Sequence, residues 1–579
     1  MFVTDFGVTN EEIHLNHHGE RERVVRYMGR VSSPSSVEKL QVGVCLLLVE
    51  LCERFTFLEV VCNMIPFCTV KLGHYNYQAA ILNLCFNGTS ILSPLFMAWL
   101  ADLCLARNKL LYICLFLHVL GSVLISVVAF PSEEFYIGPY HVINSISTKD
   151  QSKLFYVALL AIGLGTGGIR ALVCPLGAYS LWGFGPQKQA AFCDGLYWIL
   201  NLNATIVFLG ISSIQHSGSW TLVLLFPFIS TCMTLITLYM EHRHLIYQPE
   251  KCSSHLTIFR VFANILKTYC RPYCNLGRNT TPWSDHAKEK NCGGSSEFHV
   301  EGTTFVFTFL PLFTFQIIYR MCIMQIPSGY YLQTMNSNLN WDGCLLPVAV
   351  MSIVSTLPPL ILAPCLECFS TFLLPSLRDG SFLSACIIAG NLSAALSLVV
   401  AGFIEIHRKH FPPMEQPLLG KVLTVSSMSC SHLVLQYILL GVAEALVTPA
   451  FSLISHRFVP SIIRETSMNL LTLFSGFGCF TEALLIELVY LLSEGNWFPN
   501  TLNKGNLESF FFFLASLTLL NVLGFWSVSQ RYCNLNHFNT KNISGSNLEE
   551  TLLLREKSPK FYGTTQEFSS SIDLWETDL

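Results

Sequence analysis

Charged side chains are scarce in this sequence: Asp, Glu, Lys and Arg make up 12% of its 579 residues, while 51% of the residues are hydrophobic. A soluble globular domain usually carries about 25% charged residues. The deficit excludes an ordinary soluble chain and favours one that is solvated mostly by lipid. A net positive charge is also lacking, since the formal charge is −4, so we expect no nucleic-acid partner.

Two further patterns are missing. Residues 1–40 contain no apolar run of signal-peptide type, so the first hydrophobic segment is expected to serve as its own insertion signal. The 22 cysteines are spread mostly through apolar segments, without the spacing of a disulfide framework. Four of them lie in the central loop and match no usual zinc pattern: Cys252, Cys270, Cys274 and Cys292. We therefore expect free thiols and no metal site.

Long hydrophobic runs are what the sequence has instead. A membrane-spanning helix needs about 20 mostly apolar residues. Twelve segments meet this requirement: 41–70, 79–101, 109–130, 153–176, 189–212, 219–240, 303–327, 343–366, 380–404, 431–455, 467–491 and 508–530. The pattern predicts a multi-pass protein in a lipid bilayer.

Basic residues are distributed unevenly around these segments. With the N-terminus placed in the cytoplasm, the inner segments hold 24 of the 34 Lys and Arg residues and the outer loops hold six. The six are Lys149, Lys153, Arg408, Lys409, Lys421 and Lys504. Because basic residues are enriched in cytoplasmic loops, this bias predicts that both termini are cytoplasmic.

The longest loop, 241–302, falls between the sixth and seventh segments. It predicts an all-α membrane protein of twelve transmembrane helices in two six-helix bundles, the major facilitator fold, with a substrate site between the halves near the bilayer midplane. The predicted parts are an N-terminal tail (1–40), the first bundle (41–240), a cytoplasmic linker (241–302), the second bundle (303–530) and a C-terminal tail (531–579).

The first segment carries ionisable residues where the bilayer would be. Glu50, Glu53 and Arg54 are spaced i, i+3 and i+4 and share one helix face. A charge at the bilayer centre costs roughly 2.5–3.5 kcal/mol on insertion scales, so each such residue is a functional candidate. One proton could rebalance two carboxylates around one guanidinium. The alternative is a static ion pair that holds helices together.

Other segments carry isolated polar residues. Arg170 follows a glycine-rich run that permits close helix approach, and it faces a cavity or snorkels to the interface. Glu444 has no basic residue within a turn, so it pairs across helices, meets a cationic substrate group or is protonated. Tyr197 and Asn201 form one polar stripe, as site residues or as a contact between helices. For Arg320, interface snorkelling is favoured over a site role.

At these positions the sequence resembles the proton-coupled oligopeptide transporters of solute carrier family 15. Glu50-x-x-Glu53-Arg54-Phe55 is similar to the family's ExxERF motif, and GTGGIR at 165–170 is similar to its GTGGIK. LYWILN at 196–201 resembles its FYxxIN signature, and Glu444 falls in place on the tenth segment. Each match alone is weak, but their order and spacing together support the fold.

The resemblance implies roles for these residues. Glu50, Glu53 and Arg54 would take part in proton coupling, with the proton as coupling ion and no other cofactor. Arg170 would hold a substrate carboxylate and Glu444 a substrate amino group, which suits the absence of a sequence partner for either. Tyr197 and Asn201 would line the same cavity. The implied function is symport of small peptides or amino-acid-like zwitterions. No catalytic cluster is seen, so no enzymatic activity is expected.

Several departures from the family pattern thin the polar lining. Phe57 and Leu58 replace two tyrosines, and Arg170 replaces a lysine. An orphan member with an altered substrate fits this pattern, and a transport-impaired sensor or scaffold on the same fold is the alternative. The compact 405–430 loop resembles that of endolysosomal members, so the plasma membrane and the endolysosomal membrane both stay open. Glu549, Leu553 and Leu554 form an acidic dileucine pattern that a sorting adaptor could bind.

Overall fold

The computed structural model describes residues 36–103, 107–129, 148–180, 198–210, 226–240, 297–341, 344–372, 380–418, 421–457 and 464–530. The chain divides into two compact units, residues 1–522 and 523–579. The second unit contributes the end of the last helix. All packing described below lies within the first unit.

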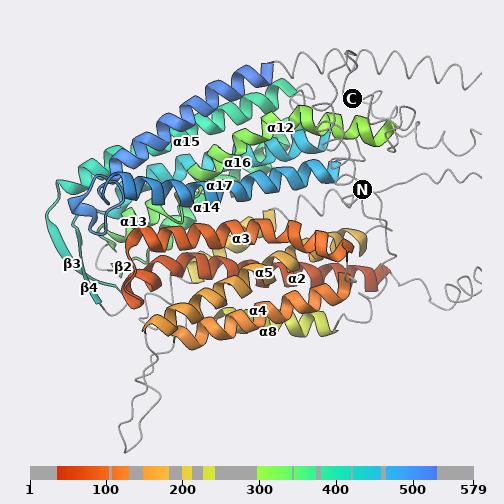
Figure 1. Ribbon diagram of the computed structural model, residues 1–579, viewed down its shortest axis with the longest axis horizontal. Coiled ribbons are helices and arrows are strands. Elements are labelled where there is room, and N and C mark those ends of the chain that lie inside the picture. Colours follow the sequence, from red (N-terminus) through yellow and green to blue (C-terminus); the bar gives the residue numbers. More distant parts are fainter. Residues whose placement is uncertain are drawn as a thin grey trace, which may run out of the picture. The chain divides into compact units, whose positions relative to one another are not determined.

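The helices before residue 241 gather on one side of Figure 1, where they are coloured red to yellow. They are α2 (Ser36–Pro66), which continues as the π-helix η1 (Phe67–Lys71), α3 (Asn76–Leu103), α4 (Arg107–Ala129), α5 (Thr148–Ser180), Trp198–Gly210 and α8 (Phe226–Met240). α4 packs along α5, and α2 lies against both α5 and α8. This packing fixes the place of the first-helix charges.

Glycines of the predicted glycine-rich run allow the close approach of α4 and α5. A Cβ atom on Gly168 would overlap the sulfur of Cys114, and one on Gly165 would lie 2.8 Å from the Cβ of His118. Small residues let helix backbones approach within a membrane bundle. The run therefore positions Arg170, which follows it on α5, at a helix junction.

The later helices occupy the other side of Figure 1, in green to blue. They are α12 (Glu297–Ile323), the short α13 (Gly329–Met335), α14 (Val350–Phe372), α15 (Gly380–Lys409), α16 (Val434–Arg457), α17 (Arg464–Leu492) and, from the helix Leu507–Gln530, residues 507–522. α16 packs against α14 and α15, and α12 packs against α17. Each of the predicted hydrophobic segments overlaps a helix of one side or the other.

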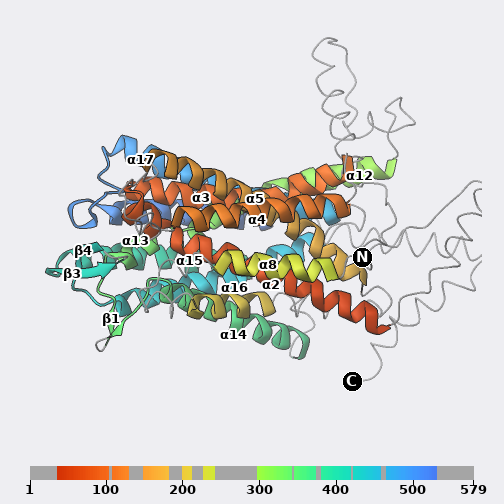
Figure 2. The same cartoon turned by 90° about the horizontal axis from the view of Figure 1, so that it is seen from below.

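Two small antiparallel hairpins, which the sequence did not predict, accompany α13 at one end of the helices (Figures 1 and 2). β1 (Asn340–Trp341) pairs with β2 (Cys344–Leu345), and β3 (Pro413–Leu418) pairs with β4 (Lys421–Ser426). α15 runs to Lys409, five residues beyond the predicted end of that segment. Arg408 and Lys409 therefore belong to the end of a helix and not to a loop, while their place on the outer side of the membrane stays a prediction.

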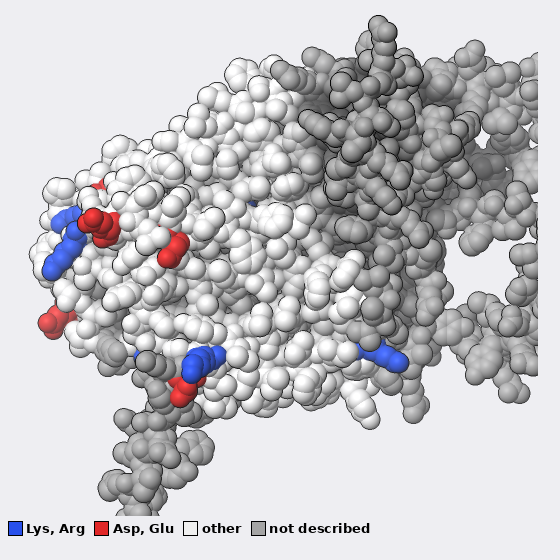
Figure 3. Space-filling model, in the orientation of Figure 1, with Lys and Arg blue, Asp and Glu red and all other residues white. Residues whose placement is uncertain are grey.

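Seven helices in the described ranges are long and apolar enough to cross a membrane: Asn76–Ala101, Lys109–Val128, Asp150–Ala171, Phe382–Lys409, Cys430–Ser455, Ser467–Leu492 and Leu507–Gln530. Large hydrophobic side chains are exposed on them, among them Phe403, Leu484 and Leu520. On the face drawn in Figure 3, the charged side chains gather mainly toward one end and the lower edge, and the rest of the described surface is uncharged. These features fit a multi-pass membrane protein, while the number of twelve spans stays a prediction.

The two groups of helices meet along α3 and α17. A Cβ atom on Gly88 would lie 2.7 Å from the Phe480 ring, and one on Gly476 would overlap Leu92. Further along α3, Asn83 Nδ2 donates to the carbonyl of Pro327 at 2.9 Å. Close packing at this junction makes the two groups of helices one described unit.

Candidate functional site

α2 places the three charged residues of the first segment on one face. Arg54 Nε lies 3.6 Å from Glu50 Oε1, and its side chain is 34% exposed. Glu53, one turn from Glu50, has no exposed side-chain surface. The spacing predicted from the sequence therefore brings these groups together, with Arg54 at the open edge of the cluster.

Arg170 joins this cluster from α5. Its Nε donates to Glu53 Oε2 at 3.0 Å, and its guanidinium carbon lies 4.4 Å from the centre of the Phe57 ring. The idea that Arg170 lacks a partner is therefore wrong, because its partner lies on another helix. Phe57 stands where the family has a tyrosine, and its ring makes a cation–π contact with the Arg170 guanidinium.

The four charged groups leave several atoms without partners in the described part of the chain. Glu50 Oε2, Glu53 Oε1 and Arg170 Nη2 are buried and form no hydrogen bond with any described residue. Unpaired buried polar atoms are rare in folded proteins. Two carboxylates and two guanidinium groups give this cluster a formal charge of zero, with spare hydrogen-bonding capacity for a ligand or a proton.

Two buried ionisable residues near this region escaped the sequence analysis. His118 on α4 and Glu59 on α2 are each 1% exposed. Within the described ranges, no hydrogen bond reaches either ring nitrogen of His118 or either carboxylate oxygen of Glu59. Glu53 and Arg170 interact electrostatically with His118. The available signal was the one used for Glu444, an ionisable residue inside an apolar run.

Glu444 lies on α16, and Arg320 on α12 interacts with it electrostatically across the helices. Of the alternatives drawn from the sequence, the structure favours pairing across helices. Arg320 also interacts with Cys479 and Glu482 of α17. This arrangement favours a site role for Arg320 over snorkelling to the interface.

Glu482 completes this second group of polar residues. Its Oε1 accepts from Gln325 Nε2 at 2.6 Å and from Ser328 Oγ at 3.1 Å, while its Oε2 is buried without a partner among the described residues. The sequence analysis missed this residue, although it also interrupts an apolar run. The later half of the chain thus groups two carboxylates with one guanidinium, whereas the cluster of the first half has two carboxylates and two guanidinium groups.

The helix Trp198–Gly210 carries Asn201, which is half-buried; Tyr197 lies outside the described residues, as does the Glu549, Leu553 and Leu554 pattern. Asn203 Nδ2 on this helix donates to the carbonyl of Leu51 at 3.1 Å. This hydrogen bond links the helix to α2 beside the first-helix charges.

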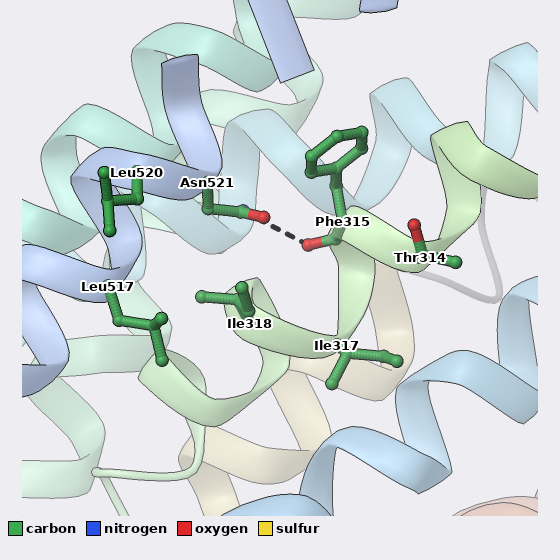
Figure 4. Close-up of a pocket in the computed structure, with 7 residues that line it drawn as sticks. All are labelled: Thr314, Phe315, Ile317, Ile318, Leu517, Leu520 and Asn521. Carbon is green, nitrogen blue, oxygen red and sulfur yellow. Dashed lines mark hydrogen bonds between the residues drawn. The ribbon is translucent and has the colours of Figure 1, made fainter. Parts of the chain in front are cut away.

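A pocket of about 400 Å³ lies between α12 and the helix Leu507–Gln530 (Figure 4). Its walls are mainly apolar, and Asn521 Nδ2 donates to the carbonyl of Phe315 at 3.2 Å beside it. The predicted site residues that the structure describes do not line this pocket. All its lining residues belong to the later half of the chain, so it is not the site expected between the halves.

Comparison with known proteins decides the family. The model described as PTR2, POT family, matches residues 109–500. The chain belongs to the POT family. It is 70% identical to human "Solute carrier family 15 member 5" over the full length of both chains, so the predicted relation to solute carrier family 15, down to this orphan member, is confirmed.

More distant relatives of this POT family chain share its length. "Protein NRT1/ PTR FAMILY 5.14" of Arabidopsis thaliana is 23% identical, over 88% of this chain and 96% of the relative. "Protein NRT1/ PTR FAMILY 8.1" of the same plant is also 23% identical, over 83% and 92%. Nearly the whole chain therefore matches family members from plants.

Solved structures are similar in fold. An auto-inhibited POT family peptide transporter gives a TM-score of 0.65 at 16% identity, over 85% of this chain and 97% of that one. The POT family transporter PepTSo gives 0.64 at 18% identity, over 87% and 99%. A POT family transporter in complex with 5-aminolevulinic acid gives 0.59 at 15% identity, over 84% and 96%. The helical fold of POT family transporters is thus established for this chain.

Proposed function

We propose that this POT family protein is a proton-coupled symporter of small peptides or related zwitterionic solutes that works by alternating access. The observation that carries the proposal is the ion pair between Arg170 and Glu53. It joins a substrate-binding candidate on α5 to a proton-coupling candidate on α2. If one of these two residues binds another partner or changes its protonation state, the other loses its counter-charge.

The coupling follows from electrostatics. A substrate carboxylate that binds Arg170 competes with Glu53 for the same guanidinium. Glu53 is then a buried carboxylate without its counter-charge, a state that is strongly unfavourable unless a proton or another cation compensates it. Proton uptake therefore accompanies substrate binding, and the proton leaves when the ion pair forms again. Glu50 and Arg54 form the second ion pair of the cluster, at its more exposed edge.

The substrate class rests on the relatives and on the second group of charges. The relative bound to 5-aminolevulinic acid holds a small amino acid, and another carries a thioalcohol-conjugated peptide. In this chain, Glu444 would receive a substrate amino group in place of Arg320, as Arg170 would receive a carboxylate in place of Glu53. Tyr197 and Asn201 would line the space between them.

The predicted topology belongs to the same proposal. Residues 41–240 and 303–530 form the two moving bundles, 241–302 is a cytoplasmic linker, and both termini are cytoplasmic. The end that carries β3 and β4 then faces outward. The protein resides in the plasma membrane or an endolysosomal membrane, and Glu549, Leu553 and Leu554 offer a sorting adaptor its contact in the C-terminal tail.

A transport-impaired sensor or scaffold is the alternative. This alternative is favoured by two contacts that hold Arg170 in place, one with Glu53 and one with the Phe57 ring. If these contacts hold Arg170 too firmly for a substrate to displace Glu53, the fold would bind a ligand without moving it. Such a protein would signal through its tails and central linker.

Proton flux in proteoliposomes tests the proposal. With a panel of dipeptides and amino acids outside, at least one solute should acidify the lumen of vesicles that contain the wild-type protein. Glu53→Gln and Arg170→Gln should abolish the signal. Gly210→Ala should keep it, since the added Cβ would have no described atom within 4 Å. Binding without acidification across the whole panel would support the sensor instead.

A further inference from the structure

His118 is a buried histidine that the proposed coupling does not yet use. It lies on α4 with 1% of its surface exposed, and both ring nitrogens lack a hydrogen-bond partner among the described residues. A neutral imidazole has one donor and one acceptor. Burying both ring nitrogens without a hydrogen-bond partner is unfavourable. Packing alone therefore gives no reason for a histidine at this position.

The surroundings of His118 link it to the ion pair. Gly165 on α5 has no side chain, and this brings the α5 backbone against the Cβ of His118. Arg170 follows five residues later on α5, and its Nε donates to Glu53 of α2 at 3.0 Å. Both interact electrostatically with His118.

The other neighbouring elements contribute neutral groups. On α4 itself, the Cys114 thiol lies 3.8 Å from Met97 Sδ of α3. On α8, Thr231 Oγ1 lies 3.0 Å from Ser122 Oγ, one turn after His118. Among the described residues, Glu53 and Arg170 are therefore the charged groups that interact electrostatically with His118.

We propose that His118 is a further proton-binding residue, which replaces Arg170 as the counter-charge of Glu53 when Arg170 turns to an anionic substrate. In the substrate-free arrangement, Arg170 neutralises Glu53 and His118 is neutral. After the exchange, a proton from solvent adds to a ring nitrogen of His118. The imidazolium donates it as a hydrogen bond to Glu53 Oε1, an atom that the described residues leave without a partner.

Charge balance supports this exchange, and this step rests on the proposed symport. Glu50, Glu53, Arg54 and Arg170 together carry no net charge. A bound carboxylate brings the site to −1, and one proton on His118 returns it to zero. The site therefore takes up one proton for each carboxylate bound, without protonation of Glu50 or Glu53.

A melting-temperature experiment in detergent tests His118 without any substrate. Arg170→Gln mimics the loss of Arg170 to a substrate, so His118 should be the remaining counter-charge of Glu53. We expect this variant to melt higher at pH 6 than at pH 8, by a shift on the order of 2 °C or more. The sign follows because a protonated imidazole stabilises the buried carboxylate and is lost as the pH rises.

Two double variants assign the effect. His118→Gln in the Arg170→Gln background should remove the advantage at pH 6, and Glu53→Gln in that background should make the melting temperature equal at both pH values. His410→Gln, a change of an exposed histidine, should leave the advantage intact. If the pH 6 advantage survives His118→Gln, Glu53 takes the proton itself and the proposal is overturned.

Nitrogen NMR of histidine-labelled protein gives the second measurement. The His118 signal, assigned by its loss in His118→Gln, should be that of a neutral ring in the wild type at pH 6 and of an imidazolium in Arg170→Gln. A neutral ring in both proteins, or a charged ring in both, would refute the exchange. Failure of every solute in the proton-flux assay would count against symport and leave this result unchanged.

Discussion

Arg408 and Glu405, three residues apart on α15, form a doubly hydrogen-bonded ion pair with no exposed side-chain surface. Arg408 Nε donates to Glu405 Oε2 at 2.9 Å and Nη2 donates to Oε1 at 2.7 Å. The remaining nitrogen, Nη1, donates to Asn503 Oδ1 at 2.7 Å and to the carbonyl of Asn336 at 3.3 Å. One guanidinium thus ties the end of α15 to two connecting segments.

The first prediction concerns this pair. Arg408→Met should destabilise the protein by about 3–5 kcal/mol, because it leaves Glu405 as a buried carboxylate without a partner. Glu405→Gln combined with Arg408→Met should recover most of the loss, since no charge then stays buried. Thermal melting in detergent measures both. Equal melting temperatures for the single and double variants would show that lost packing, not the stranded charge, dominates.

The second prediction concerns the contact of α4 with α5. Gly168→Ala should cost about 1–3 kcal/mol of stability, since its Cβ would overlap the Cys114 sulfur in a well-packed interior. Gly210→Ala is the matched control, because no described atom lies within 4 Å of its added Cβ. Melting temperatures of the two variants decide the point. A Gly168→Ala protein as stable as the control would mean that the helices can separate at little cost.

The ion pairs Arg408–Glu405 and Arg170–Glu53 also show how much of the structure could be predicted from the sequence. Apolar runs are a local property, so the positions of the helices followed from hydropathy. Arg408 was assigned to a loop and not to a helix because hydropathy treats a charged residue near a helix end as a loop residue, although its partner Glu405 lies within the same turn. The partner of Arg170 lies 117 residues away on α2, and no spacing rule connects such residues.

The missed residues have a similar physical origin. His118, Glu59 and Glu482 each interrupt an apolar run, which is the same signal that marks Glu444. Their burial and their unpaired atoms are properties of several packed helices together. The motifs predicted the cluster on α2, whereas the neighbour that could share its proton required the packing of α4 on α5.

A third prediction uses the pH dependence of the loop between η1 and α3. His74 Nε2 lies 3.1 Å from the hydroxyl of Tyr156, and burial lowers the pKa of His74. A histidine with a lowered pKa in the folded state is most favourable when neutral, so stability is lost as the pH falls below about 6.5. His74→Gln should reduce the drop in melting temperature between pH 7 and pH 5. Since the ring is half-exposed, the change should be below about 1 kcal/mol.

The fourth prediction concerns the contact of α3 with α17 at the end that carries the hairpins. The rings of Tyr77 and Tyr490 stack with centroids 3.7 Å apart. Nearby, Asn76 Nδ2 donates to the carbonyls of Pro499 and Asn500, at 3.2 and 2.8 Å. Alternating access requires these helix ends to separate in each cycle, so a link between them should hold the protein in one state.

Tyr77→Cys with Tyr490→Cys, treated with a short reducible thiol cross-linker, should therefore lose proton-coupled uptake in proteoliposomes and regain it after reduction. Each single variant, treated in the same way, controls for reaction with the native cysteines. Asn76→Ala should act in the opposite direction, because it removes two bonds across the junction, and it should speed the labelling of the thiol introduced by Tyr490→Cys. Undiminished uptake in the cross-linked protein would mean that this end stays closed throughout the cycle, and the proposed alternating movement would have to be abandoned.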